Sequence, residues 1–185
     1  LEDRSREKFN ADMKEFFNPL VPGLPRGDLY NYFLDLDSRQ WTEWKKLVKP
    51  YVYDPEVTYF RILVETNDTV RFKHILYVMN SANYNVLLMG NGGVGKSSIV
   101  KDYLFNLSKE RFAFATTTFS AQTSSNNIVN LLTEKLVVKG RGLGASSGKK
   151  FIFHFDDINM PKLDQYGAQP PNELLRQIID QGGFY

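Results

Sequence analysis

Residues 85–98 read NVLLMGNGGVGKSS. Within this stretch, residues 90–97 match the pattern G-x-x-x-x-G-K-[ST] in full. The apolar residues 85–89 predict a strand that leads into the glycine-rich turn, and residues 96–107 predict a helix that leads out of it. A strand, a glycine-rich turn and a helix in this order predict a loop that binds the phosphates of a nucleotide.

Each residue type in this loop serves phosphate binding. Glycines allow the backbone to turn with positive φ and to approach a phosphate without a Cβ clash. Successive N–H groups form a concave nest for oxyanions, and the following helix adds its positive N-terminal end. The ammonium of Lys96 is predicted to bind the β- and γ-phosphates, and the hydroxyl of Ser97 is predicted to bind Mg²⁺. The residues predicted to bind nucleotide in this loop are Gly90, Asn91, Gly92, Gly93, Val94, Gly95, Lys96, Ser97 and Ser98.

An apolar strand ending in two carboxylates is predicted at residues 151–157, which read FIFHFDD. Strands buried on both faces of a parallel sheet read as continuous apolar runs, and ligands bind at their carboxyl ends. Asp156 is therefore predicted to hold Mg²⁺ through its water shell, and Asp157 is predicted to position or activate the attacking water. His154, inside the strand, is predicted to be a core or interface histidine. The predicted metal site is Ser97 and Asp156, and the predicted catalytic residues are Lys96 and Asp157.

The remaining segments alternate between helices and strands. This alternation predicts an α/β fold of the P-loop NTPase class, in which a parallel sheet is flanked by helices and preceded by a helical lead-in. The predicted domains are a helical connector at 1–27, an aromatic-rich lead-in at 28–68 and a partial P-loop core at 69–185. Helices are predicted at 1–18, 41–48, 69–80, 125–138 and 171–181, a further strand at 112–119, and a polar loop at 140–150.

The composition argues against several other classes of protein. The chain has 185 residues, with 23 Lys and Arg against 21 Asp and Glu, and its net charge is +2. These charges are interspersed and form no basic stripe, so no nucleic-acid partner is predicted. No apolar run approaches the roughly 18 residues that span a bilayer, so no membrane partner is predicted. With no cysteine in the chain, neither a disulfide framework nor a structural zinc site is expected.

Several segments of the chain resemble dynein heavy chains. Their order is that of the third AAA+ module of the dynein motor ring, and the resemblance covers about residues 28–185. The form DDINMP followed by YGAQPP is more similar to axonemal than to cytoplasmic heavy chains. The segments are WTEWKKLV at 41–48, LVETNDTVR at 63–71, FSAQTSS at 119–125 and FHFDDINMPKLDQYGAQPPNELLRQIIDQGGFY at 153–185.

The resemblance implies an ATP-binding AAA+ module of a microtubule motor that drives ciliary or flagellar movement. In such motors the first ring module supplies most of the hydrolysis, and the third binds nucleotide and gates the ring. The implied cofactors are ATP and Mg²⁺. The implied partners are neighbouring AAA+ modules, dynein intermediate and light chains, and a microtubule bound through parts outside these residues. The implied location is the cytoskeleton of the cytoplasm, in the axoneme of a cilium or flagellum.

The resemblance also assigns residues and exposes two departures from the family. It places Leu63 and Val64 in the segment that lines the adenine pocket. AAA+ proteins commonly carry Asp-Glu at the strand end, whereas this chain has Asp157 at the second position. Because Asp is one methylene shorter, slow hydrolysis or regulatory binding is predicted. The sensor strand, the small helical lid and an arginine finger are not identified, so the isolated residues are expected to fold poorly and to hydrolyse little ATP, although the full-length protein would be an ATPase motor.

Two alternatives remain open beside the motor module. One is a nucleotide-binding structural or gating module without turnover, which Asp157 and the missing arginine finger favour. The other is an unrelated P-loop NTPase, such as a small-molecule kinase or a GTPase. That class needs acceptor or base-recognition motifs, and the sequence shows none, including no N-K-x-D guanine reader.

Overall fold

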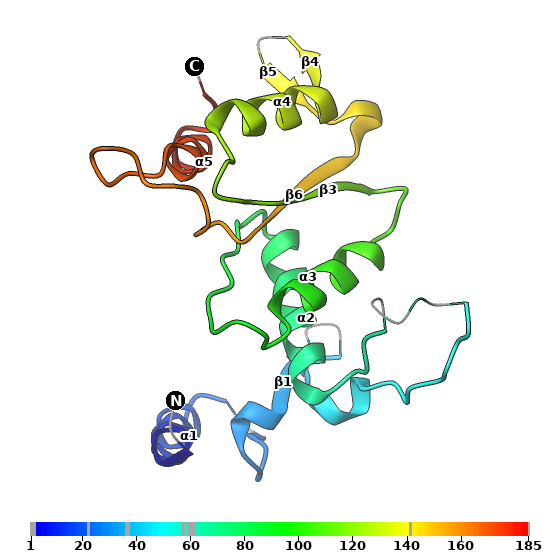
Figure 1. Ribbon diagram of the computed structural model, residues 1–185. Helices are drawn as coiled ribbons and strands as arrows, with labels where there is room; N and C mark the ends of the chain where they lie inside the picture. Colours follow the sequence, from blue (N-terminus) through cyan, green and yellow to red (C-terminus); the bar gives the residue numbers. More distant parts are fainter. Residues whose placement is uncertain are drawn as a thin grey trace. The chain divides into compact units, whose positions relative to one another are not determined.

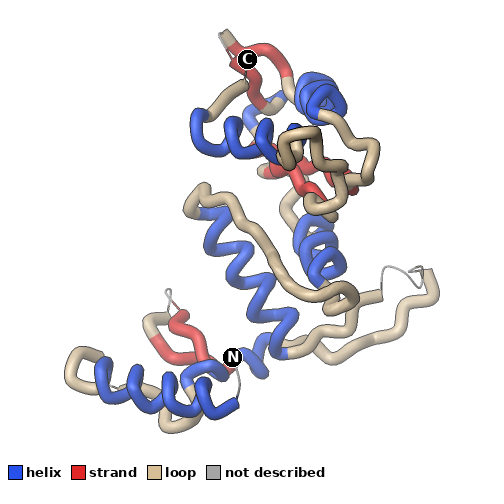
Figure 2. The backbone as a smooth tube through the Cα atoms, turned by 60° about the vertical axis from the view of Figure 1, so that its left-hand side comes forward, coloured by secondary structure: helices blue, strands red, loops and turns tan. Residues whose placement is uncertain are grey.

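The computed structural model describes residues 3–21, 23–35, 38–56, 58, 62–140 and 142–184. These residues form two compact units, residues 1–86 and residues 87–185, each with its own helices and strands (Figures 1 and 2). No helix in the described ranges is both long enough and apolar enough to cross a lipid bilayer.

The first unit combines helices with one small antiparallel sheet. The helix predicted at 1–18 is confirmed, although its first two residues lie outside the described part of the chain. The helix predicted at 69–80 is also confirmed. The elements are α1 (Asp3–Phe17), η1 (Leu29–Asn31), β1 (Tyr32–Asp35), β2 (Gln40–Glu43), η2 (Trp44–Leu47) and α2 (Asn67–Ser81).

The helix predicted at residues 41–48 is wrong in its first half. Residues 40–43 form strand β2, which pairs antiparallel with β1, and only Trp44–Leu47 are helical, as a 3-10 turn. Trp44 is buried, and its ring stacks on Phe33 of β1 with 4.4 Å between ring centroids. Pairing with β1 and aromatic packing therefore override the local helical pattern, as tertiary contacts commonly do.

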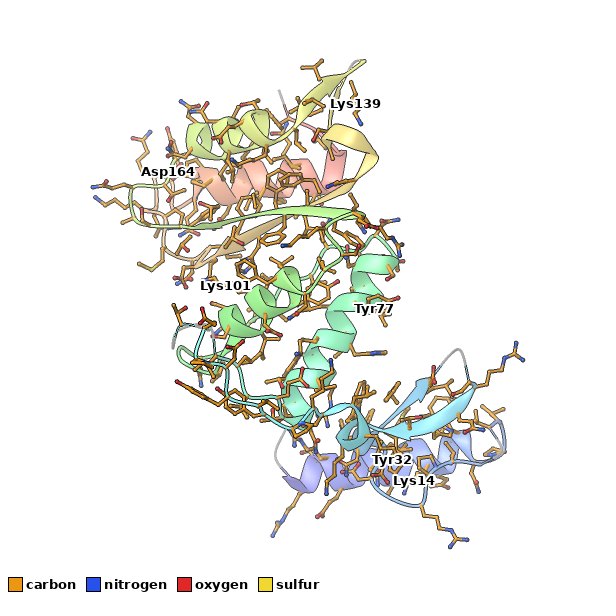
Figure 3. All side chains as sticks on the ribbon, turned by 90° about the vertical axis from the view of Figure 1, so that its right-hand side faces the viewer. Lys14, Tyr32, Tyr77, Lys101, Lys139 and Asp164 are labelled. Atoms are coloured by element: carbon orange, nitrogen blue, oxygen red, sulfur yellow. The ribbon has the colours of Figure 1, made fainter. Side chains whose placement is uncertain are left out.

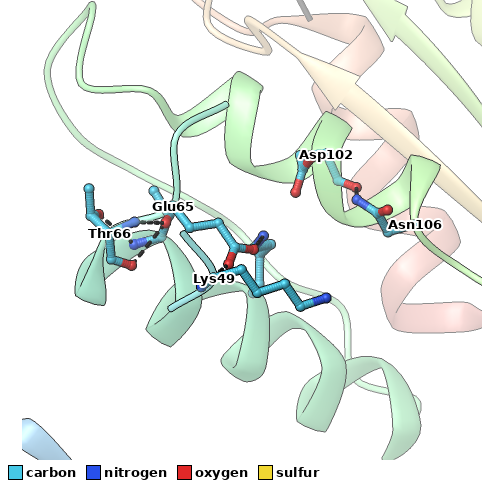
Figure 4. Close-up of polar contacts among 7 residues, drawn as sticks. Lys49, Glu65, Thr66, Asp102 and Asn106 are labelled. Atoms are coloured by element: carbon cyan, nitrogen blue, oxygen red, sulfur yellow. Dashed lines mark hydrogen bonds and ion pairs between the residues drawn. The ribbon is translucent and has the colours of Figure 1, made fainter. Parts of the chain in front are cut away.

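The segment before α2 is fixed by a carboxylate and a helix cap. Glu65 accepts hydrogen bonds from the Lys73 ammonium at 2.5 Å and from the Lys49 N–H at 3.0 Å (Figure 4). Partial burial alone would raise the pKa of Glu65, but these donors hold that pKa below its ordinary value. Thr66 and Thr69 exchange hydrogen bonds in a capping box at the start of α2. These hydrogen bonds therefore fix the backbone of residues 62–66 against the start of α2.

The second unit is built around a parallel strand pair. β3 and β6 are parallel and in register from Phe112 opposite Lys150 to Thr118 opposite Asp156. This pair confirms the predicted parallel α/β arrangement, and the Phe119 N–H extends it by one bond to the Asp156 carbonyl at 2.8 Å. The elements are α3 (Lys96–Phe105), β3 (Phe112–Thr118), α4 (Ser125–Lys135), β4 (Val137–Lys139), β5 (Gly142–Gly144), η4 (Ser146–Gly148), β6 (Lys150–Asp156) and α5 (Pro170–Gln181).

Helices cover both faces of the strand pair. α4 and α5 lie on one face and α3 on the other (Figure 1). Phe153 and Phe155 of β6 pack against the buried cluster of Phe119, Ile128 and Leu132 on the α4 side. Because side chains alternate along a strand, Asp156 points to the opposite face, toward α3. The alternation therefore separates an apolar face from a face that carries the predicted metal-site carboxylate.

The predicted strand at residues 85–89 is not a strand in this structure. Residues 84–91 are irregular, and no described strand pairs with them. Leu87 and Met89 are 64% and 84% exposed, whereas a strand inside a parallel sheet would bury both faces. The apolar pattern is present, but a strand forms only through a ladder of hydrogen bonds to a neighbour. The parallel sheet of the described residues is therefore limited to β3 and β6.

The predicted loop at 140–150 and the end of the helix predicted at 125–138 are also corrected. α4 ends at Lys135, and β4 and β5 form an antiparallel hairpin in which Val138 faces Leu143. Gly140 has φ of 62°, which a turn between two strands requires. β-Branched residues at 137 and 138 favour a strand over another helical turn. Arg141 lies outside the described residues.

The N-terminal cap of α4 gives a first test of the fold. The Ser124 hydroxyl accepts a bond from the Asn127 N–H, and the Asn127 side chain accepts from the Ser124 N–H. We expect Ser124→Ala to lower the free energy of unfolding by about 1 kcal/mol, because the cap of the helix that carries Ile128 is lost. Hydrogen exchange of α4 peptides, in the motor region that carries these residues, measures the change, with the exposed Ser146→Ala as control. Equal effects of the two substitutions would contradict the prediction.

Candidate nucleotide-binding site

The glycine-rich loop adopts a backbone that only glycine accepts readily. Gly93 and Gly95 have φ of 77° and 87°, and Gly95 is the N-cap of α3. Side chains with a Cβ are strained in this region of φ. A Cβ at Gly92, Gly93 or Gly95 would meet no atom within 4 Å, so the loop surface is open. The loop therefore presents its backbone and the N-terminus of α3 to an incoming group. Val94 and Ser98 are exposed beside these glycines.

Lys96 is folded onto its own loop. Its ammonium donates hydrogen bonds to the Gly90 carbonyl at 2.9 Å and to the Asn91 carbonyl at 2.6 Å. When phosphate binds, its oxygens would have to replace these two carbonyls as hydrogen-bond acceptors of the Lys96 ammonium. The cation predicted to bind phosphate is therefore held at the loop.

Ser97 and Asp156 meet although they are far apart in the sequence. The Ser97 hydroxyl donates a hydrogen bond to Asp156 Oδ1 at 2.7 Å. Asp156 Oδ2 lies 3.6 Å from the ammonium of Lys101, one turn after Ser97 on α3. The Asp156 side chain is 16% exposed and that of Lys101 is 44% exposed. α3 thus supplies a hydroxyl and a cation to the carboxylate that ends β6.

The residues present fit a magnesium ion. Mg²⁺ prefers oxygen ligands and is usually bound by one or two protein oxygens together with phosphates and water. The Ser97 hydroxyl and the Asp156 carboxylate are two such oxygen donors in direct contact. Ser97 is in the first turn of α3, next to the loop predicted to bind phosphate, and the Asp156 carboxylate at the end of β6 contacts it there. The geometry therefore agrees with the chemistry of a Mg²⁺–nucleotide site.

Asp157 leaves the strand with an unusual backbone. Its φ is 55°, and its carbonyl accepts a hydrogen bond from the Met160 N–H at 3.0 Å. Asp and Asn are enriched several-fold among non-glycine residues with positive φ. The side chain is exposed and makes no hydrogen bond or ion pair with other described residues. Its role with the attacking water remains a prediction.

Two amides at the N-terminus of α5, one on its N-cap residue and one in its first turn, hold the loop that follows Asp157. Gln169 Nε2 donates to the carbonyls of Asn159 at 3.0 Å and Pro161 at 2.6 Å. Asn172 Nδ2 donates to the Ile158 carbonyl at 2.8 Å and to Gln169 Oε1 at 2.7 Å. These residues were missed by the sequence analysis. The only local signal is the pair of amide side chains flanking the two prolines at the start of α5.

His154 lies close to the charged pair on the α3 side of β6. Burial lowers the pKa of His154, the carboxylate of Asp156 opposes that shift, and the ammonium of Lys101 adds to it. His154 Nδ1 is buried without a hydrogen-bond partner among the described residues. His154 is therefore partly buried, as predicted, but one polar atom of its ring is unsatisfied.

The structure brings some of the predicted site residues into contact and leaves others without a contact to them. Lys96 contacts the carbonyls of its own loop, and Ser97 contacts Asp156. Leu63 is half-buried and Val64 is 53% exposed, and both belong to the first compact unit. Their assignment to an adenine pocket therefore remains a prediction.

Two family models match the chain. Residues 51–185 match the model of the P-loop containing dynein motor region. Residues 1–46 match the model of the dynein heavy chain AAA lid domain. Together the two matches cover most of the chain, and the first includes every residue assigned above to phosphate or metal binding.

Relatives of the chain include axonemal and flagellar dynein heavy chains. The chain is 40% identical to human "Dynein axonemal heavy chain 6" over 86% of its residues and 32% identical to human "Dynein axonemal heavy chain 2" over 100%. It is 35% identical over 100% of its residues to the Chlamydomonas reinhardtii "Dynein-1-beta heavy chain, flagellar inner arm I1 complex". The matched region spans only 4% of the length of each of these relatives.

Proposed function

Because the chain belongs to the family of the P-loop containing dynein motor region, we propose that it binds ATP with Mg²⁺ as one AAA+ module of an axonemal dynein heavy chain. The observation that best supports this proposal is the hydrogen bond of Ser97 to Asp156, 59 residues apart in the sequence. That bond joins the end of the glycine-rich loop to the carboxyl end of a parallel strand, where ligands bind in such sheets.

The side chains divide the binding work by their chemistry. Lys96 exchanges the carbonyls of Gly90 and Asn91 for the β- and γ-phosphates, while the loop N–H groups hold the phosphate oxygens. Ser97 and Asp156 would hold Mg²⁺ through their oxygens. Bound Mg²⁺ neutralises charge on the transferred phosphate. Asp157 orients the attacking water.

We propose that turnover at this site is slow or regulatory. Asp157 is one methylene shorter than the glutamate common at this position in AAA+ proteins, so a water that it holds is displaced from the phosphate. The exposed side chain of Asp157 has no described partner to orient it. The same observations favour the second candidate, a nucleotide-binding gating module without turnover.

The wider assignments rest on the relatives. We propose that the complete protein is a microtubule motor of the ciliary or flagellar axoneme, whose track is bound by parts outside these residues. Its proposed partners are the neighbouring AAA+ modules and the dynein intermediate and light chains. The proposed domains are a connector from a preceding module at residues 1–27, the aromatic-rich lead-in at 28–68 and the P-loop core at 69–185. The lid-domain match at residues 1–46 supports only a separate origin of the N-terminal part from the P-loop core.

Photolabelling with an azido-adenine ATP tests the proposed function at this one site. The label is read on peptides from residues 1–185 of the motor region that carries them, so nucleotide bound to other modules does not interfere. We expect Ser97→Ala to weaken Mg²⁺-dependent labelling about tenfold, because one metal ligand is lost, and to leave labelling in a metal chelator unchanged. The exposed Ser108→Ala is the control. No labelling of the unmodified site, or an equal loss with and without metal, would contradict the proposal.

A further inference from the structure

We propose that Lys101, the ion-pair partner of Asp156, sets the magnesium requirement of this site by weakening Mg²⁺ binding once nucleotide is bound. The inference rests on the proposed function, since it concerns the same Mg²⁺–ATP site. It adds a residue that the loop pattern and the strand pattern do not include.

The contacts of Asp156 carry the proposal. Its Oδ1 accepts the Ser97 hydroxyl at 2.7 Å, and its Oδ2 lies 3.6 Å from the Lys101 ammonium. Ser97 and Lys101 are four residues apart on α3, so both side chains lie on one face of the helix. Lys101, labelled in Figure 3, extends from α3 toward β6. Both oxygens of the predicted metal-site carboxylate are thus paired with side chains of α3.

The position of Lys101 separates it from the phosphate-binding cation. Lys96 lies at the first position of α3 and contacts the loop carbonyls. Lys101 is five residues later, which is about 7.5 Å further along the helix axis at 1.5 Å per residue. Among the described residues, Lys101 pairs with the Asp156 carboxylate and not with the glycine-rich loop. Lys101 therefore acts on the metal ligand, and metal-free nucleotide affinity should not depend on it.

The sign of the effect follows from the charges. A cation beside a metal ligand repels Mg²⁺ and competes for the same carboxylate oxygens. The Lys101 side chain is 44% exposed, so solvent screens this repulsion and keeps it modest. We expect Lys101→Met, which keeps much of the side-chain length but removes the charge, to tighten Mg²⁺ binding by about three- to tenfold. A substitution that tightens metal binding is not expected of an ordinary structural lysine.

A magnesium titration tests the proposal in the motor region that carries these residues. The module is labelled with a fixed concentration of azido-adenine ATP at increasing concentrations of free Mg²⁺. The Mg²⁺ concentration that gives half-maximal labelling, the midpoint, is read on peptides from residues 1–185. Lys101→Met is compared with Lys101→Arg, which keeps the charge, and with Lys135→Met on α4. Lys135 is a matched control because its side chain is 41% exposed and it pairs with Glu134. Thermal unfolding of each variant shows that the fold is kept.

The expected result is a lower Mg²⁺ midpoint for Lys101→Met alone, with unchanged labelling in chelator. Because the effect is electrostatic, the difference should shrink as ionic strength rises. An unchanged or higher midpoint would overturn the proposal. A loss of labelling in chelator would also overturn it, because Lys101 would then bind phosphate. If the unmodified module takes up no label under any condition, the proposed function itself fails. If the unmodified module titrates normally and Lys101→Met does not change the midpoint, only the proposal for Lys101 fails.

Discussion

Lys96→Ala is expected to reduce ATP labelling of this module about 100-fold, which corresponds to about 2.7 kcal/mol of binding free energy. The ammonium is the only side-chain cation placed on the glycine-rich loop by the described contacts, where it holds the carbonyls of Gly90 and Asn91. Charge-assisted hydrogen bonds to phosphate oxygens are each worth about 1.5–3 kcal/mol. Removing them therefore accounts for a loss of this size without any change of fold.

The measurement is site-specific photolabelling in the motor region, with and without Mg²⁺. Lys96→Ala should lose labelling in both conditions, whereas Ser97→Ala should lose only the metal-dependent part. Lys135→Ala on α4 is the control, since its ion pair with Glu134 lies on the surface. Normal labelling of Lys96→Ala would mean that the loop does not bind phosphate through this lysine, and the proposed site would be wrong.

Asp157→Asn is expected to slow hydrolysis at this site by about 100-fold and to leave ATP binding unchanged. Asparagine keeps the size of the side chain and tolerates positive φ as aspartate does. The substitution therefore removes the charge that would orient or deprotonate water while the turn at φ of 55° is retained. Binding should be insensitive, because the described metal-side contacts are made by Ser97 and Asp156.

Single-turnover labelling separates hydrolysis from binding at this module. Azido-ATP labelled at the α- or the γ-phosphate is bound, aged for different times and then crosslinked. Loss of the γ-label with retention of the α-label on peptides from residues 1–185 reports turnover here. The exposed Asp180→Asn on α5 is the control. If the unmodified site keeps its γ-label as long as Asp157→Asn does, Asp157 is not catalytic and the module is a nucleotide-dependent gate.

The elements with strong local patterns could be predicted from the sequence. α3 follows the glycine-rich loop, β6 is a continuous apolar run, and α5 begins with prolines and ends at Gly182, whose φ is 69°. Each of these signals is carried by neighbouring residues. The parallel pairing of β3 with β6 could also be expected from the alternation of strands and helices.

The elements that depend on distant partners could not be predicted. Residues 85–89 have the composition of a strand, but a ladder requires a neighbour, and none is present among the described strands. β2 was mistaken for helix because its pairing with β1 and the packing of Trp44 on Phe33 are tertiary contacts. The β4–β5 hairpin was read as a loop because its strands have only three residues each.

The candidate site divides in the same way. Lys96, Ser97 and Asp156 belong to recognised patterns, and the direct bond between Ser97 and Asp156 agrees with their predicted roles. Lys101 could have been suspected from its spacing to Ser97 on one helix face, but only the fold shows that Asp156 lies opposite. The amide contacts of α5 with residues 158–161 have no sequence pattern at all.

The backbone at Asp157 limits which acids this position can accept. A longer glutamate would reach further toward a bound phosphate, but it lacks the short polar side chain that lets Asp and Asn adopt positive φ with little strain. At φ of 55°, Asp157→Glu would cost about 1 kcal/mol of backbone strain, unless the turn to Met160 relaxed. The shorter acid at this position is thus the one that its own backbone accepts with less strain, so the identity of the acid and the shape of the turn are coupled.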